Sequence, residues 1–327
     1  LDAIDHRKHV VMVNAELDSL LGPILNERAR QAGVVLTNTD GDEPGVAMTL
    51  LRYLRTLGLH VVAAGNIKGM VDYYRNPDTQ RAFAQKNDQD ARKVTSFADA
   101  TKLSMETTVL ANATGFRAGR RGMFGPSCKN VQELADRLPA DAMLETGLVD
   151  YALGAAPHTG AFAIVHESSP LKKAQLAYYK LGDGPFYVFY TPFHLPHIQI
   201  ASTIGRAVID HDPTVAPIGG PVCEVVAVAK RDLKAGERLD GVGGFCTYGL
   251  IENAAEARSL AALPIGLSEN CILRCDKKKD DVVLLDDVVL PAGRQIDALW
   301  REQQMRWPVL KSMTQASSDR ELAAIAG

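Results

Sequence analysis

Three charged residues share one face of a helix that the sequence predicts from Asp99 to Gly115. No proline or glycine interrupts the stretch, Ser96 is placed to cap its start, and Gly115 suits its end. Asp99, Lys102 and Glu106 are its only charged residues, and their spacing puts all three on one face. A partly desolvated Lys102 can act as a proton donor, its pKa lowered towards neutrality and tuned by the carboxylates. The alternative is a partly exposed helix with a structural ion-paired seam.

Polar residues follow two short apolar strands near the start of the chain. The strands are expected at Val10–Val13 and Val34–Leu36, on either side of a helix at Leu17–Ala32. Their apolar runs are continuous, which indicates a parallel sheet covered on both faces. Ligands of doubly wound sheets bind at the carboxyl ends of strands, so Asn14–Glu16 and Asp40–Glu43 are placed for a site. The Gly-x-Gly-x-x-Gly dinucleotide fingerprint is absent from the sequence.

The acidic loop after the second strand has two interpretations. Asp40, Asp42 and Glu43 are carboxylates on a short loop, which suits a hard divalent cation. Asp42, Glu43 and Pro44 also suit the start of a helix near Gly45, because acidic residues and proline favour the first turn. The second interpretation is favoured; under the first, Asp40 and Asp42 are the metal ligands.

Basic residues in glycine-rich segments are candidate anion ligands. A strand at Leu59–Ala64 leads into an expected loop, Gly65–Gly69, where Lys68 either binds an anion or is solvated. Arg117 and the two arginines that follow it closely can hold a phosphate, make a subunit contact, or lie in solvent. His158 precedes a strand at Ala161–Val165 and can touch substrate. The arginines after Arg117 are Arg120 and Arg121.

The second half of the chain predicts a further strand, a returning helix and a β module. The strand is residues 185–191, and the helix Ile198–Val208 is of the kind that covers a sheet. His194 and His197 precede that helix but lack a third metal ligand nearby. A turn-rich β module starts near Pro217. The tail from Arg294 to Gly327 is expected to be helical and to dock through Trp300 and Trp307.

Composition limits the class of protein. The chain has 327 residues and a net charge of −3, so no basic surplus indicates nucleic acid or a membrane surface. No apolar run approaches the roughly 20 residues of a membrane span. Five cysteines without metal-site spacing indicate reduced thiols and a cytoplasmic protein. Because Leu1 lies at the end of an expected helix before a buried strand, we expect a piece whose N-terminal part is missing.

Several segments together resemble homoserine dehydrogenases. Val10–Asn14 resembles the strand that ends in their Ala-Asn-Lys motif beside the nicotinamide, and Asp42–Gly45 falls at their Gly-Ile-Pro helix start. Gly65–Tyr74 is similar to their substrate loop, and Phe97–Glu106 is similar to their catalytic Asp-x-x-x-Lys helix. The module Pro217–Pro291 is similar to SAF domains of the β-clip type. This order of parts is that of the branch resembling 1-deoxy-D-xylulose 5-phosphate reductoisomerase.

The resemblance implies an α/β fold with three parts: a partial Rossmann-type doubly wound sheet, a central α+β substrate and oligomerisation domain, and a small C-terminal SAF-like β module. The expected boundaries are 1–45 for the partial nucleotide-binding domain, 46–192 for the central domain, 193–216 for the returning helix, 217–293 for the β module and 294–327 for the helical tail.

The implied activity is an NADPH-dependent oxidoreductase of the reductoisomerase type. It would convert 1-deoxy-D-xylulose 5-phosphate to 2-C-methyl-D-erythritol 4-phosphate in isoprenoid precursor synthesis, with Mg²⁺ or Mn²⁺ as a further cofactor. A homo-oligomer and a phosphorylated small-molecule substrate are expected partners. A dehydrogenase of another small polyol, hydroxy acid or sugar phosphate stays open, as does a non-catalytic ligand-binding protein on the same scaffold.

Residue types and resemblance together predict the site. Lys102 is the expected proton donor, supported by three further catalytic residues. The catalytic set is Lys102, Asp99, Glu106 and Lys68; the substrate set is Gly65, Asn66, Asn112, Thr114, Arg117 and His158; the cofactor set is Asn14, Ala15 and Glu16; the metal set is Asp40 and Asp42.

Overall fold

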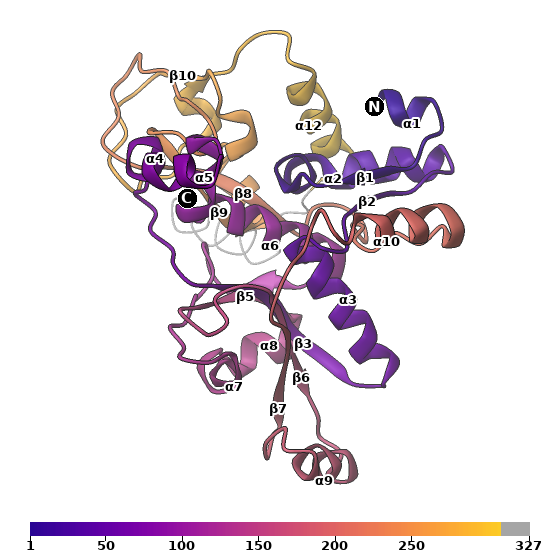
Figure 1. Cartoon of the computed structure of the whole chain (residues 1–327). Helices are drawn as coiled ribbons and strands as arrows, with labels where there is room; N and C mark the ends of the chain where they lie inside the picture. The colour runs from indigo at the N-terminus through magenta and orange to yellow at the C-terminus, as the bar shows by residue number, and fades with distance from the viewer. Residues whose placement is uncertain (309–327) are drawn as a thin grey trace, which may run out of the picture.

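Strand β3 (His60–Lys68) is the centre of the largest sheet. In the computed structural model, which describes residues 1–308, this sheet has five strands in the order β4–β5–β3–β6–β7 (Figure 1). β3 pairs in parallel with β5 and antiparallel with β6, so both of its edges are hydrogen-bonded. Its apolar run Val61–Ala64 is buried, as expected for a strand covered on both faces. The other strands are β4 (Arg117–Ala118), β5 (Leu148–Leu153), β6 (Ala161–His166) and β7 (Phe186–Thr191).

The expected loop Gly65–Gly69 is instead the end of β3, which runs to Lys68. The reason lies at Gly65. A Cβ there would lie 1.6 Å from the backbone oxygen of Asp150 on β5, so the glycine permits close packing of two strands rather than approach of a substrate. The residues that follow are therefore held rigidly on a strand. The sequence also missed β5 itself, while the strands predicted at 161–165 and 185–191 are confirmed.

Helices cover both faces of the five-stranded sheet. On one face lie α3 (Glu43–Thr56) and α6 (Thr101–Thr114), which contact β3 directly. On the other face, Leu134, Leu138 and Met143 pack against Ile67 and Phe162 of the sheet. These three residues come from the short elements after β4: the 3₁₀ turn η1 (Val131–Glu133), α7 (Leu134–Arg137) with its following residues, and α8 (Ala140–Thr146).

A second, two-stranded parallel sheet carries the start of the chain. β1 (Val10–Met12) pairs with β2 (Leu36–Asn38), and α2 (Ala15–Gln31) connects them. β2 begins two residues later than expected, because buried residues 34 and 35 precede the paired segment. The expected returning helix is present as α10 (Ile200–Gly205), continued by the π-helical turn η2 (Arg206–Asp210). It lies beside β1 and β2 in Figure 1.

The helix expected to start at Ser96 is two helices. α5 (Ala91–Ala98) ends before Asp99, and α6 begins at Thr101. Between them Ala100 has a left-handed backbone with φ of 69°, which turns the chain and changes the direction of Asp99. Gly115 ends α6 with φ of 81°, as predicted.

The C-terminal part is built on an antiparallel pair that packs on α6. β8 (Cys223–Ala229) and β9 (Thr247–Asn253) both contact this helix (Figure 1). This pair lies in the turn-rich β module predicted for residues 217–293; its SAF-like identity stays a prediction. The module's other elements are α11 (Ala254–Ser259), η3 (Ile265–Leu267), β10 (Ile272–Leu273), η4 (Leu285–Asp287) and β11 (Val288–Val289).

The predicted helical tail begins as α12 (Gln295–Arg306), which packs on α2. Trp300 and Trp307 are partly buried against the main core, as the sequence predicted. Residues 309–327 of that prediction lie outside the described residues. The remaining helices of residues 1–308 are α1 (Asp2–Asp5), α4 (Pro77–Lys86) and α9 (Pro170–Tyr178). Within residues 1–308 no helix has both the length and the apolar character required to cross a membrane.

Candidate active site

A polar cluster lies where β3, α3 and α6 meet. Lys68 Nζ, at the end of β3, is 2.8 Å from Glu43 Oε1 on α3 and 3.2 Å from Glu106 Oε2 on α6. Asn66 Nδ2 donates to the same Glu106 oxygen at 2.9 Å. Alternate residues of a strand point to the same side, so Asn66 and Lys68 both reach α6. Three elements thereby position one group of side chains.

Lys102 extends this cluster towards the start of α2. Its Nζ lies 3.3 Å from each carboxylate oxygen of Glu16. Lys102 and Glu106 are one turn apart on α6, so they lie on the same face of the helix. The Lys102 side chain is only 12% exposed, whereas that of Glu16 is 39% exposed. The lysine is thus a largely buried ammonium group with one side towards solvent.

Three carboxylates of the cluster are close enough to share a cation. Asp42, Glu43 and Glu106 each offer one oxygen, and these oxygens lie within 4.8 Å of one another. All three residues are buried. Within residues 1–308, Asp42 Oδ2 has no hydrogen-bond partner. The helix-start interpretation of the acidic loop is confirmed, because Asp42 is the N-cap of α3 and Glu43 is its first residue, and the same two residues also face the cluster.

Burial and ion pairing oppose each other at Glu43 and Lys68. Burial raises the pKa of Glu43, but Lys68 and then His194 outweigh it and lower that pKa to about 2. Burial lowers the pKa of Lys68, but Glu106 and Glu43 outweigh it and raise that pKa above its ordinary value. At neutral pH these two residues form a charged pair.

At the other two carboxyl groups of the cluster, Asp42 and Glu106, burial has the larger effect on the pKa. Burial, together with the charge of Glu43, raises the pKa of Glu106 to about 8. The same two causes raise the pKa of Asp42 to about 7. Protons are therefore held within this cluster near neutral pH, beside two ammonium groups. Such an arrangement suits general acid–base chemistry.

The predicted lowering of the Lys102 pKa is wrong in direction. Burial does lower this pKa, as expected, but the charges of Glu106, Asp42 and Glu16 outweigh burial and raise it. Two of those carboxylates come from segments more than fifty residues away in the chain, so the helix sequence alone did not reveal them. Lys102 is therefore a protonated ammonium group at neutral pH.

Asp99 and Asp40 do not join the cluster. The Asp99 carboxylate lies 2.8 Å from Lys230 of the β module, because the turn at Ala100 directs it away from Lys102. The Asp40 carboxylate accepts a hydrogen bond from Ser202 at 3.1 Å and lies 3.6 Å from Arg206. Both are held by structural contacts, and the acidic group that does gather at the site is Asp42 with Glu43 and Glu106.

Asn112 and Thr114 lie at the far end of α6 from Lys102. At about 1.5 Å per residue they are about 15 Å or more along the helix from that lysine. Asn112 Oδ1 accepts from the backbone of Val222 at 2.8 Å, and the Thr114 hydroxyl donates to Leu110 O at 2.8 Å. The structure gives both side chains a structural role and does not place them with the cluster.

The arginines near β4 do not form a phosphate cradle. Arg121 pairs with Glu252 at 2.7 Å, and Arg120 donates to the backbone oxygen of Met123 at 2.9 Å. Arg117 is exposed on β4. Arg120 and Arg121 are therefore bound within the chain, so the three arginines do not gather on one ligand.

His158 and His194 lie beside the end of β3. A Cβ on Gly69 would be 3.2 Å from the Cβ of His158, which places this exposed histidine next to the residue after Lys68. His194 Nε2 lies 3.6 Å from Glu43 Oε1, and its Nδ1 is 3.0 Å from the Thr159 hydroxyl. Sequence reasoning considered His194 only as a metal ligand and Glu43 only in the acidic loop. His194 and Glu43 each follow a predicted strand and come just before a predicted helix, and this position was the available signal for both.

The segment that carries His194 is fixed by close backbone packing. A Cβ on Gly41 would lie 2.3 Å from the Leu195 carbonyl oxygen, so only glycine allows residues 39–41 to touch residues 195–196. The Thr203 hydroxyl also accepts from the backbone of Asp40 at 2.8 Å. These contacts bring the segment after β7 back to the start of α3.

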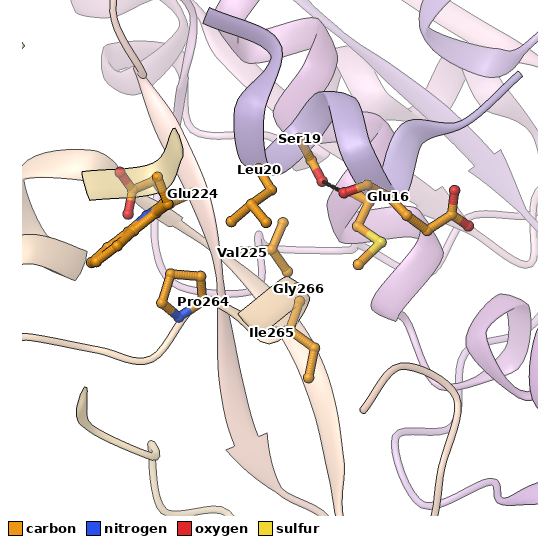
Figure 2. A pocket seen from close by; sticks show the side chains of 10 residues that line it. Glu16, Ser19, Leu20, Glu224, Val225, Pro264, Ile265 and Gly266 are labelled. Atoms are coloured by element: carbon orange, nitrogen blue, oxygen red, sulfur yellow. Dashed lines mark hydrogen bonds between the residues drawn. The ribbon is translucent and has the colours of Figure 1, made fainter. Parts of the chain in front are cut away.

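Two cavities border this region without containing the lysines. Figure 2 shows the smaller, about 10 Å³, which is lined by Leu20, Val225, Ile265 and neighbours and is roughly the size of one water molecule. Glu16 lies at its edge. The larger, about 280 Å³, lies between α3 and the segment after β7 and is lined by residues including Tyr53 and Phe193. The candidate site is therefore identified by its charged cluster.

Comparison with known proteins gives one family-model match. Residues 41–200 match the family model described as "Oxidoreductase DRL, catalytic domain". The match supports an enzyme that acts as an oxidoreductase. It spans somewhat less than half of the chain, includes Asp42, Glu43, Asn66, Lys68, Lys102 and Glu106, and leaves out Glu16 and the C-terminal β module. A search of curated proteins gives no significant match.

Proposed function

We propose that this protein is an NADPH-dependent oxidoreductase of the reductoisomerase type, acting on 1-deoxy-D-xylulose 5-phosphate. The observation that carries the proposal is the juxtaposition of Lys102 with Glu16 at the carboxyl end of the β1–β2 sheet, beside the buried cluster of Lys68, Glu43 and Glu106. The similarity to an oxidoreductase catalytic domain supports the same class.

Lys102 is the proton donor in this proposal. NADPH, when bound, would supply a hydride to the aldehyde carbon that rearrangement of the sugar phosphate's carbon skeleton produces. Lys102 then gives a proton from its ammonium group to the carbonyl oxygen as the negative charge develops, so the carbonyl becomes an alcohol. Glu16, Asp42 and Glu106 keep Lys102 protonated at neutral pH. Glu106, with a pKa of about 8, can return a proton to the lysine.

The start of α2 fits a nicotinamide. Asn14 caps this helix by accepting from Leu17 N at 2.8 Å, and the Glu16 carboxylate, in the first turn, lies 3.3 Å from Lys102 Nζ. Val13, at the carboxyl end of β1, is 40% exposed although it is apolar. Val13 and the start of α2 would hold the nicotinamide, which would supply the hydride.

A divalent cation is the second proposed cofactor. Asp42, Glu43 and Glu106 offer the oxygen donors that Mg²⁺ and Mn²⁺ prefer, and the unpartnered Asp42 oxygen lies among them. In this proposal Asp42, Glu43 and Glu106 hold the ion, and Asp40, which the sequence also predicted as a ligand, does not. Lys68 already bridges Glu43 and Glu106, so binding of the ion requires the lysine to release one of them.

One observation favours a second candidate, a dehydrogenase of an unphosphorylated polyol or hydroxy acid. Within residues 1–308, Lys68 is paired with two acidic side chains, Arg121 with Glu252, and Arg120 donates to the Met123 carbonyl oxygen. A phosphate group needs cations to hold it. A neutral or singly charged substrate needs fewer, and Lys102 with Asn66 could hold its oxygen atoms.

We also propose that the chain works as a homo-oligomer. β7 pairs with β6 on one side and has no strand on the other among residues 1–308. The helix between β6 and β7, α9, carries strongly exposed apolar side chains, among them Leu171 (73%) and Tyr178 (72%), and Tyr179 (69%) follows it. Exposed apolar patches mark protein interfaces, and a second copy related by two-fold symmetry can cover its own counterpart. The molar mass in solution tests this.

The deciding experiment is NADPH oxidation, followed by absorbance, with 1-deoxy-D-xylulose 5-phosphate and Mg²⁺ or Mn²⁺. We expect turnover in the parent protein, its loss in Lys102→Met, and full activity in the control Lys86→Met, an exposed lysine on α4. Turnover with an unphosphorylated polyol or hydroxy acid in place of the sugar phosphate would select the second candidate. Failure to bind NADPH at all would refute both.

A further inference from the structure

Lys230 makes three short contacts deep between the β module and the catalytic region. It follows β8 directly and is 5% exposed. Its Nζ donates to Asp99 Oδ2 at 2.8 Å, to the Arg75 carbonyl oxygen at 2.7 Å and to the Gly244 carbonyl oxygen at 2.8 Å. An ammonium group has three protons, so each finds one acceptor. The lysine thereby joins three segments at one point.

One of these contacts leads to Lys102. Asp99 Oδ1 accepts from the backbone N–H of Thr101, the first residue of α6, at 3.0 Å. The Thr101 hydroxyl accepts from Gly249 N of β9 at 2.8 Å. Asp99 and Thr101 are fully buried. The start of α6, one residue before Lys102, is therefore fixed by the β module.

Another contact leads to Lys68. Arg75 ends the segment that follows β3, so its carbonyl oxygen lies seven residues after Lys68. The β module holds the same segment at two further points. Tyr73 stacks on Tyr248, with ring centroids 5.1 Å apart, and the Tyr74 hydroxyl donates to Asp280 at 3.0 Å.

We propose that Lys230 is a positioning residue for the candidate active site. Through Asp99 it fixes the start of α6, which carries Lys102 and Glu106. Through the Arg75 carbonyl it fixes the segment that leaves β3 after Asn66 and Lys68. This inference rests on the proposed function for its catalytic part, and it gives the β module, which lies outside the matched residues 41–200, a role in the reaction.

The contacts of Lys230 predict which kinetic parameter changes when this lysine is replaced. The proposed cofactor residues, Asn14 to Glu16, belong to α2, which Lys230 does not touch. Loss of Lys230 should therefore lower kcat while the KM for NADPH stays the same. A displacement of about 1 Å at a proton donor can cost on the order of 100-fold in rate.

The test compares two charge-neutral pairs of substitutions. Lys230→Met with Asp99→Asn removes the junction without leaving an unpaired buried charge. Arg258→Met with Glu224→Gln is the control: these residues form a largely buried ion pair at 2.9 Å within the same module, between α11 and β8. We expect kcat to fall about 10- to 100-fold in the first variant. We expect less than about a twofold change in the control.

Hydrogen exchange of the backbone gives a readout that does not need activity. We expect amides of residues 69–76 and 99–106 to exchange about tenfold faster or more in the Lys230 double variant, and not in the control. Asp99→Asn alone keeps Lys230 and its hydrogen bonds to the Arg75 and Gly244 carbonyl oxygens, and it weakens only the contact with residue 99. It should loosen residues 99–106 while residues 69–76, still bonded through Arg75, stay protected.

The outcomes separate this inference from the proposed function. Equal exchange and equal kcat in the Lys230 and control variants would overturn the positioning role. If the parent protein shows no turnover, the proposed function fails, and exchange in the two segments still decides whether Lys230 positions them. If the double variant does not fold, the selective loosening in Asp99→Asn decides the same question.

Discussion

Replacing Glu106 by glutamine should make the protein more stable at pH 8. The folded state holds the proton of Glu106 up to a pKa of about 8, whereas the unfolded carboxyl releases it near its ordinary value of 4.5. Between these two values the unfolded state binds fewer protons than the folded state. The free energy of unfolding therefore falls as pH rises from 4.5 to 8, and glutamine, which does not titrate, removes this loss.

The size of the stability gain follows from the difference between the folded and unfolded pKa values of Glu106. At about 1.4 kcal/mol for each pKa unit, the shift corresponds to about 5 kcal/mol at pH 8. Part of the gain is offset because Lys68 loses one of its two carboxylate partners. The Asn66 amide can still donate to the glutamine oxygen, so no buried donor is left unpaired. A net gain of about 2 kcal/mol remains, and at about 2–4 °C for each kcal/mol it raises Tm by roughly 5 °C.

The assay is thermal unfolding of the parent and Glu106→Gln at pH 5 and pH 8, in the same buffer ions. The stability gain should be present at pH 8 and nearly absent at pH 5, where the parent carboxyl is already protonated. Glu252→Gln is the matched control, because this buried glutamate pairs with Arg121 far from the cluster. It should lower Tm at both pH values. A Glu106→Gln protein that is less stable than the parent at pH 8, or equally stabilised at pH 5, would refute the reasoning.

Three other substitutions test the site and its scaffold. Lys102→Met should lower kcat by at least about 100-fold with little change in the KM for NADPH, measured by steady-state kinetics; an unchanged kcat would exclude it as the acid. Gly65→Ala places a Cβ 1.6 Å from the Asp150 backbone oxygen and should cost about 3 kcal/mol or more, measured by urea unfolding; a loss below about 1 kcal/mol would contradict the close packing of β3 and β5. Ala100→Gly relieves a left-handed φ of 69° and should add about 0.5–1 kcal/mol of stability, provided kcat is retained; a loss of stability would show that the turn does not strain the chain.

Many of the strands and helices were predictable because runs of apolar residues in the sequence indicate them. Ala161–Val165 is a continuous apolar segment and forms β6, and Lys102 and Glu106 share a face of α6 as their spacing requires. The prediction that Asp99 shares a helix face with Lys102 was wrong because it assumed one helix. Alanine gives no warning of a left-handed turn, since that conformation is typical of glycine and asparagine, yet Ala100 adopts it.

The electrostatics of the site could not be predicted from local sequence. Whether the pKa of Lys102 falls or rises depends on carboxylates that only the fold brings near, such as Glu16 and Asp42. The prediction of a loop at Gly65 was wrong for a related reason. A glycine beside polar residues indicates a loop, but here the backbone of β5, a strand the sequence did not predict, requires it.

The position of β3 has a consequence for the order in which the elements of the protein unfold. A strand bonded along both edges opens only when two ladders separate, so its amides exchange with solvent late in unfolding. Asn66 and Lys68 lie on this strand, whereas β7, among residues 1–308, is bonded along one edge only and should fray earlier. Heating should therefore loosen the β7 edge while the polar cluster is still assembled. Damage to the outer strand is then an early and separable event, and loss of the cluster coincides with global unfolding.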